Sequence, residues 1–344
     1  MNPVSTNKTF LVSHICETLL IVAVLLLYSS LVSAAIYQCK NASGKIAFQD
    51  HPCVDTGVND NRYHDNTGTI TNDDKKHFLW KATRFDQSVY LLGSIHVGRS
   101  DMYPLHGSVM AAFHQSEVLM VEVNTQAINQ LKLAETVRHI GMYPEGTTLE
   151  QQIPKPLWEQ LVATGKALNV PEIMFQRQKP WLASITLTTA MIGKSGYQAD
   201  YGIDKYFLKQ ATDLNKEIVE LESIDSQMQL FANFSDAEQL SLLSNGLNEL
   251  KQGTILFDKL VNAWSNGDHQ ALDKLARGSM GVNDKESSLF KVMITDRNQS
   301  MAQKIIKAMQ DKRKYFVVVG AAHLVGKQGV PALLKAQGFT IEAL

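Results

Sequence analysis

The sequence has no excess of charge of either sign. It carries 33 Lys and Arg against 34 Asp and Glu over 344 residues, which gives a formal net charge of −1. A nucleic-acid-binding surface needs a basic excess, so we expect no nucleic-acid partner. Hydrophobic residues make up 44% of the chain and charged residues 19%, which indicates an ordinary globular protein with a sizeable core.

The sequence also lacks the signature motifs of several common enzyme classes. There is no His-Glu-x-x-His, no Gly-x-Ser-x-Gly and no Gly-x-Gly-x-x-Gly. Zincins of that type, α/β-hydrolases and dinucleotide enzymes are therefore disfavoured. Gly193-Lys194-Ser195 has no upstream glycine of a phosphate-binding loop, which argues against a P-loop nucleotide hydrolase. Any active centre must be built from a different pattern.

The N-terminal segment 1–35 has the order of a secretory signal peptide. A weakly basic start with Lys8 precedes the apolar run 19–27, and small residues follow up to Ala34 and Ala35. The apolar run is shorter than the roughly 20 residues of a membrane-spanning helix, so we expect cleavage and a periplasmic or secreted protein. The alternative is an uncleaved anchor, and only then would the protein contact a membrane.

Cysteine is scarce, with only three residues in the chain. Cys16 lies within the expected signal peptide, which leaves Cys39 and Cys53 as an even pair in an oxidising compartment. We therefore expect a disulfide between them, and two free thiols are the alternative. Two alternating segments around Gly44 predict a β-hairpin domain over residues 36–54. An isolated hairpin is marginally stable in water, and the disulfide would hold it together.

Residues 55–76 are rich in Asn, Asp, Thr and Gly, which predicts a linker before a main domain over residues 77–344. Apolar and alternating segments in the main domain predict strands near both of its ends, with helices between them. The predicted strands are 78–83, 88–92, 118–123, 218–221, 315–319 and 339–342. This order predicts an α/β or α+β fold, with a mixed sheet assembled from the N- and C-terminal strands around a large helical insert.

Two of the predicted strands end in the same pattern, Gly-x-x-His. Val-Tyr-Leu-Leu-Gly-Ser-Ile-His ends at His96, and Phe-Val-Val-Val-Gly-Ala-Ala-His ends at His323. A glycine at the end of a buried strand allows a tight turn at the carboxyl edge of the sheet, where α/β proteins bind ligands. A single histidine is more often structural, but two that end two strands predict one shared centre.

A metal or proton-transfer centre also needs carboxylates. Glu122 follows the apolar run Val-Leu-Met-Val, which predicts a place at the same edge, with a surface-edge glutamate as the alternative. Glu222 follows a weaker strand, and Asp204 begins an expected helix, where it could also serve as the N-cap. Glu222 and Asp204 are the candidates for general base. Arg297, beside Asn298 in a charged helix, could stabilise an oxyanion, and a solvent-facing helix surface is its alternative.

Short blocks across residues 77–344 resemble the TraB/GumN family, which also contains the Tiki metalloproteases. The resemblance rests on residues 91–98, 101–105, 121–123, 179–181, 202–204, 221–223 with Gln227, 296–298 and 320–326. Ser94, Asn124 and Ala322 stand where Thr, Asp and Gly are common in the family, so no acidic role is expected at Asn124. The hairpin segment is similar to a small N-terminal domain of unknown function found on exported proteins.

The resemblance implies a fold similar to erythromycin-esterase-like and ChaN-like haem-binding proteins. It also implies a metal-dependent peptidase or hydrolase in which His96, His323 and Glu122 hold a divalent ion such as Mn²⁺, Co²⁺ or Zn²⁺. The substrate would be a peptide or protein. The alternative is a non-enzymatic protein that binds haem, a metal or a signalling peptide in the same crevice. His269, in an expected loop, should play no part in the centre.

Export predicts a mature protein that begins at Ala35 or Ile36, because the small residues of the cleavage site end there. Sequencing of the N-terminus of protein isolated from its native host should find one of these two residues. A sequence that begins at Met1 would contradict the cleaved signal peptide.

The disulfide predicts that thiol reagents label neither Cys39 nor Cys53 in periplasmic protein prepared without reductant. After reduction both should be labelled, and the hairpin should loosen while the main domain stays folded, because it does not depend on this bond. Labelling of both cysteines before reduction is the outcome that speaks against the bond.

Overall fold

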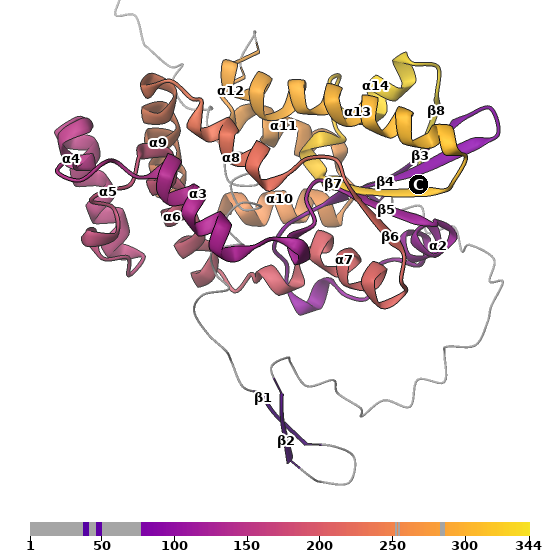
Figure 1. The fold of residues 1–344 in the computed structure, drawn as a ribbon, viewed down its shortest axis with the longest axis horizontal. Helices are drawn as coiled ribbons and strands as arrows, with labels where there is room; N and C mark the ends of the chain where they lie inside the picture. The colour runs from indigo at the N-terminus through magenta and orange to yellow at the C-terminus, as the bar shows by residue number, and fades with distance from the viewer. Residues whose placement is uncertain (1–36, 41–45, 50–76, 252, 254, 283–285) are drawn as a thin grey trace, which may run out of the picture. The chain divides into compact units, whose positions relative to one another are not determined.

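The computed structural model describes residues 37–40, 46–49, 77–251, 253, 255–282 and 286–344 (Figure 1). The predicted signal peptide, the linker and Cys53 fall outside these ranges. Within them, no helix has the length and apolar character needed to cross a membrane. The described residues belong to two compact units, one with the hairpin and one with residues 77–344.

The smaller unit contains an antiparallel hairpin of β1 (Tyr37–Lys40) and β2 (Ile46–Gln49). Tyr37 pairs with Gln49 and Lys40 with Ile46. This is the segment in which alternating residues predict two short strands around Gly44.

The larger unit is built on a mixed sheet, and its described strands lie in the order β6-β5-β7-β4-β3-β8. The strands are β3 (Leu79–Arg84), β4 (Gln87–Ser94), β5 (Val118–Val121), β6 (Glu217–Glu220), β7 (Tyr315–Gly320) and β8 (Thr340–Ala343). β4, β7, β5 and β6 pair in parallel, whereas β3 is antiparallel to both β4 and β8. The sheet is thus assembled from both ends of the chain, and the predicted fold class is confirmed.

Helices cover both faces of the central strands. Figure 1 shows α13 and α14 on one side of the sheet and α2 and α7 on the other. Residues of β5 and β7 are accordingly apolar on both faces, with Met120 and Val317 in one core cluster and Val121 and Phe316 in the other. Continuous apolar runs of this kind are typical of parallel strands that are buried on both sides. The polar residues Glu122 and His323 follow β5 and β7 at the carboxyl edge, and both are buried.

Most of the described chain outside the sheet is helical, and all the α-helices but α2 and α14 lie between β5 and β7. The helices are α2 (Gly107–Gln115), α3 (Gln130–Gly141), α4 (Leu149–Gln152), α5 (Lys155–Ala167), α6 (Pro180–Lys194), α7 (Ile203–Asp213), α8 (Ile224–Ala232), α9 (Asp236–Leu250), α10 (Ile255–Ser265), α11 (His269–Ser279), α12 (Ser288–Phe290), α13 (Asp296–Ala308) and α14 (Val330–Ala336). Helices α4, α5, α6 and α9 share a separate apolar cluster around Leu161, Phe175 and Leu243. These helices therefore form a subdomain with its own small core.

A π-helical segment, Lys291–Thr295, leads directly into α13. A π turn holds an extra residue compared with an α turn, so it changes which side chains of the following helix face inward. Arg297 and Asn298, at the start of α13, are 4% and 0% exposed despite the charged sequence around them. The alternative that Arg297 lies on a solvent-facing helix surface is therefore wrong.

His269 is also placed differently from the prediction, because it is the first residue of α11 and not part of a loop. Its ring packs against Phe78 and Trp80, with ring centroids 4.6 and 4.5 Å away. Its Nε2 lies 3.0 Å from the carbonyl oxygen of His77. Replacing His269 would disturb packing, so it is a poor control for substitutions in the centre.

Candidate active site

The carboxyl edge of the sheet brings His96, Glu122 and His323 together. They follow β4, β5 and β7, and the backbone N–H of Gly320 donates to Glu122 Oε1 at 2.6 Å. A Cβ on Gly320 would lie 3.2 Å from Glu122 Oε1, 3.6 Å from His96 Nε2 and 3.7 Å from His323 Cδ2. All three side chains therefore surround one point. The two rings are therefore less than twice 3.7 Å apart, short of the ~10 Å separation that would exclude a shared centre, although two ligand atoms on one ion must lie closer still.

The three side chains line a cavity of about 10 Å³. The other residues that line it are Ser94, Ile95, Gly320, Ala321 and Ala322. A cavity of roughly 10–15 Å³ is needed to hold one water molecule, so this cavity matches a single water or ion. Gly320 keeps the space open because it has no Cβ. Within the described residues, His323 Nε2 is buried at this cavity without a hydrogen-bond partner, and Glu122 Oε1 is 3.8 Å away.

Asn298 fixes the orientation and tautomer of His323. Asn298 Nδ2 donates to the carbonyl oxygen of Gln328 at 2.7 Å, so Asn298 Oδ1 faces the ring and accepts from His323 Nδ1–H at 2.5 Å. The lone pair of His323 is therefore on Nε2, at the cavity. Burial lowers the pKa of His323 to about 4, with a further contribution from the positive charge of Arg297. The ring is consequently neutral at pH 7.

Asp204 holds the other histidine in a similar way. Its Oδ1 lies 3.1 Å from His96 Nδ1, which leaves His96 Nε2 for the cavity. Burial lowers the pKa of His96, but the charge and hydrogen bond of Asp204 and the charge of Glu122 together raise it above its usual value. Asp204 lies in the first turn of α7, and Gly202 is the N-cap, so the N-cap alternative for Asp204 is wrong.

Glu122 carries a buried negative charge that Arg297 neutralises. Arg297 Nη2 donates to Glu122 Oε2 at 2.7 Å and to Glu222 Oε2 at 2.6 Å, and Arg297 Nε donates to Glu222 Oε1 at 2.8 Å. Burial raises the pKa of Glu122, but the neighbouring charges of His323, Arg297 and His96, with the N–H of Gly320, lower it by more. Glu122 is therefore an ionised carboxylate at neutral pH.

These contacts leave little of Glu222 and Arg297 for substrate. Arg297 Nη1 donates to the carbonyl oxygen of Met293 at 3.2 Å, so only one of its N–H groups has no bond to these partners. Gln227 donates to Glu222 at 2.8 Å and to Glu122 at 3.3 Å. Arg297 and Gln227 therefore position Glu122. Gln227 belongs to the blocks that resemble the family, but no role in the centre is predicted for it from the sequence.

Within the described ranges, no group of three or more His, Cys, Asp or Glu side chains is arranged as a metal-binding set. The spacing at the centre gives a physical reason. Two ligand atoms ~2.0–2.2 Å from one tetrahedral ion lie about 3.4 Å apart. His323 Nε2 and Glu122 Oε1 are 3.8 Å apart, and the bond from Gly320 N–H holds Oε1 in place. Shared coordination would need a contraction of a few tenths of an ångström.

Curated proteins similar to the chain include uncharacterized proteins and proteins named metalloproteases. Uncharacterized protein YbaP of Escherichia coli (strain K12) is 26% identical over 263 residues, which cover 75% of this chain and 94% of YbaP. An uncharacterized protein of Treponema pallidum (strain Nichols) is 20% identical over 266 residues, or 74% and 79% of the two chains. Metalloprotease TIKI2 of Danio rerio is 21% identical over 328 residues, or 79% and 62%. No solved structure matches the chain significantly.

Two family models match the sequence. The model described as Domain of unknown function (DUF4124) matches residues 23–69, which include the hairpin. The model of the TraB/PrgY/gumN family matches residues 78–343 and so contains the sheet from β3 to β8 and every residue of the centre. Because this match covers most of the chain, the protein belongs to the TraB/PrgY/gumN family.

Proposed function

We propose that the protein is a metal-dependent peptidase, exported to the periplasm or beyond, in which His96, His323 and Glu122 hold a divalent ion. The observation that carries this proposal is the buried Nε2 of His323, which faces Glu122 Oε1 at 3.8 Å across a cavity of about 10 Å³. Both atoms are acceptors and repel each other, and a cation between them would satisfy both. Relatives named metalloproteases support the activity.

The protonation states at the centre also suit a cation. Divalent metals bind neutral imidazole and ionised carboxylate, and binding releases protons if these forms are not already present. The lowered pKa of His323 and the lowered pKa of Glu122 provide these forms at neutral pH. The pKa of His96 is raised, so binding of an ion would release the proton that this ring carries in its protonated form. Two nitrogen atoms and one oxygen atom are a donor set that Zn²⁺, Co²⁺ or Mn²⁺ accepts.

When bound, the ion would polarise the scissile carbonyl and acidify a water molecule. The chain contributes the geometry: Asp204 and Asn298 hold the two rings, and Arg297 holds Glu122. Hydrolysis adds the hydroxyl of water to the carbonyl carbon and moves a proton to the leaving nitrogen, which yields a carboxylate and an amine. Neither predicted base lines the small cavity: Arg297 and Gln227 occupy the oxygens of Glu222, and Asp204 faces Nδ1 of His96, on the side of the ring away from the cavity.

The non-enzymatic alternative of haem binding has less support. A porphyrin is many times larger than a cavity of about 10 Å³, and the two histidine rings converge on one small space at its wall. A Soret band after addition of haem to the purified protein would favour this alternative.

Replacement of a metal ligand should abolish metal binding and hydrolysis without unfolding the protein. His96→Ala, His323→Ala and Glu122→Gln each remove one donor from a three-residue site. The fold should survive, because Glu122→Gln keeps the shape of the side chain and Glu222 still pairs with Arg297. Elemental analysis of the purified variants and titration with Zn²⁺, Co²⁺ and Mn²⁺ measure binding. Cleavage of a peptide library before and after a chelator measures hydrolysis, and circular dichroism measures folding.

His139→Ala is the matched control, because His139 is exposed in α3 and lies outside the centre. It should bind metal and cleave peptides like the wild type. If the His96 and His323 variants also bind metal like the wild type, the shared-ion model is wrong.

Asn298→Ala should weaken metal binding without abolishing it. The substitution removes the acceptor that keeps the proton of His323 on Nδ1, and loss of such a ring-orienting partner costs about 10–100-fold in metal affinity. The measurement is the dissociation constant of Zn²⁺ in the variant beside that of His323→Ala. An unchanged affinity would show that Asn298 does not set the tautomer.

A further inference from the structure

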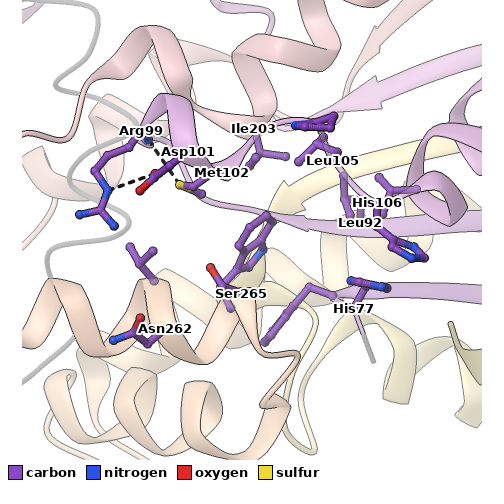
Figure 2. Close-up of a pocket in the computed structure, with 15 residues that line it drawn as sticks. His77, Leu92, Arg99, Asp101, Met102, Leu105, His106, Ile203, Asn262 and Ser265 are labelled. Carbon is purple, nitrogen blue, oxygen red and sulfur yellow. Dashed lines mark hydrogen bonds and ion pairs between the residues drawn. The ribbon is translucent and has the colours of Figure 1, made fainter. Parts of the chain in front are cut away.

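A second, larger cavity lies at the same end of the sheet as the centre. It has a volume of about 330 Å³ and lies between the chain that follows β4 and helix α10. Figure 2 shows Arg99 and Asn262 toward one end of this edge cavity, and His77 and His106 toward the other. It is about twice the ~150 Å³ of an apolar protein cavity that holds benzene. The space therefore suits an aromatic group together with the backbone that carries it.

The most buried part of the edge cavity's lining, its floor, includes apolar residues, and charged and polar residues make up much of the rest. Leu92, Val109, Ile203 and Val261 line it and are each at most 5% exposed. The indole N–H of Trp264, which also lines it, donates to the carbonyl oxygen of Gly93 at 2.7 Å and so is not available to a ligand. A charged group placed on this floor would lose its hydration without compensation, whereas an apolar group would gain from burial.

The rim charges are already paired with each other. Arg99 Nε lies 3.4 Å from Asp101 Oδ1, and both side chains are largely exposed. The Arg99 guanidinium also lies over the ring of Tyr197, 4.6 Å from its centroid. A ligand with one strong charge would have to compete with these contacts in water, where ion pairs contribute little. The rim therefore favours a neutral polar group, such as a peptide backbone.

Contacts link one wall of the edge cavity to the centre, although the two cavities have no lining residue in common. Ile203 lines the cavity, its N–H donates to the carbonyl oxygen of Ile95 at 2.9 Å, and the next residue, Asp204, holds His96. Between Met102 and Pro104, which line the cavity, the hydroxyl of Tyr103 donates to the carbonyl oxygen of Tyr201 at 3.0 Å, just before α7. The carboxyl edge of an α/β sheet is where ligands of such proteins bind.

We propose that the edge cavity receives a large apolar side chain, aromatic or branched, of the peptide substrate. This inference rests on the proposed peptidase function and adds a substrate class to it. The substrate backbone would cross the polar rim, and the residue seated in the cavity would lie close to the bond that is cut. A peptide whose residue at this position is acidic, basic or small would lose the apolar contact and be cleaved less efficiently.

Binding can be tested without catalysis by using the full mature chain without added metal. The probes are the N-acetyl methylamides of Phe, Leu, Asp and Lys, and methyl NMR of Leu92, Leu105 and Ile203 reports on the edge cavity. The Phe and Leu amides should shift these signals and bind at least about tenfold more tightly than the Asp and Lys amides, as expected for an apolar pocket. Equal binding of all four, or no shift at these residues, would overturn the proposal.

Ser265→Phe adds volume at the end of α10, where Ser265 lines the edge cavity and is partly exposed. It should weaken binding of the Phe amide by about tenfold or more. Ser241→Phe, the same replacement at an exposed position of α9, should leave binding unchanged. If Ser265→Phe does not fold, Leu105→Ala provides the opposite change. Leu105→Ala enlarges the cavity, so it should improve binding of the N-acetyl methylamide of Trp relative to that of Leu. An unchanged ratio of the two dissociation constants would speak against an apolar side chain in the edge cavity.

Binding of toluene tests whether the edge cavity takes any free apolar ligand or specifically a side chain that is attached to a peptide backbone. If toluene binds as tightly as the Phe amide, the backbone adds nothing and the peptide assignment is overturned. In metal-loaded protein, the ratio of kcat/KM for peptides with Phe over Ala beside the cut bond should fall in Ser265→Phe. If no peptide is cleaved while the amides bind as expected, the proposed function fails and the apolar site stands. If peptides are cleaved without this preference and the amides do not bind, the edge-cavity proposal fails and the proposed peptidase function stands.

Discussion

The buried charge of Glu122 constrains the arrangement of everything around it. A carboxylate at the end of a buried strand requires compensation, and here the compensation comes from Arg297 on α13, Gln227 on α8 and the N–H of Gly320 on β7. Each contact fixes a different element against the sheet edge. Glu222, after β6, joins the same network and balances the charge of Arg297. The network therefore stabilises the centre and sets its geometry at the same time.

The two histidines occupy equivalent places on either side of this network. Each has its Nδ1 held by an oxygen of a neighbouring helix, Asp204 of α7 or Asn298 of α13, and each leaves its Nε2 at the small cavity. The two oxygen partners differ in charge, and the pKa of the histidines shifts in opposite directions as a result of this and of Arg297. The site is thus symmetric in geometry but not in electrostatics.

The sequence predicts the sheet and the meeting of His96, Glu122 and His323, because strand ends follow directly from apolar runs that stop at Gly-x-x-His or at Glu. The contacts that define the centre are less accessible to such reasoning. Arg297 and Asn298 face inward because a π-helical segment precedes α13, and no hydrophobic periodicity signals one extra residue in a turn. The edge cavity depends on where α10 packs, which local patterns do not encode.

The position of β7 in the sheet has a consequence for how the protein is made. β7 lies between β4 and β5, although it is synthesised almost two hundred residues after β5. A growing chain that has not reached residue 315 holds β4 and β5 but lacks the strand that joins them, so the sheet has a gap at its middle. Contacts between such distant segments form slowly, because a long loop must close first. The centre is therefore assembled only once the ribosome has nearly finished the chain, and a transcript cut short by a late stop codon encodes no centre at all.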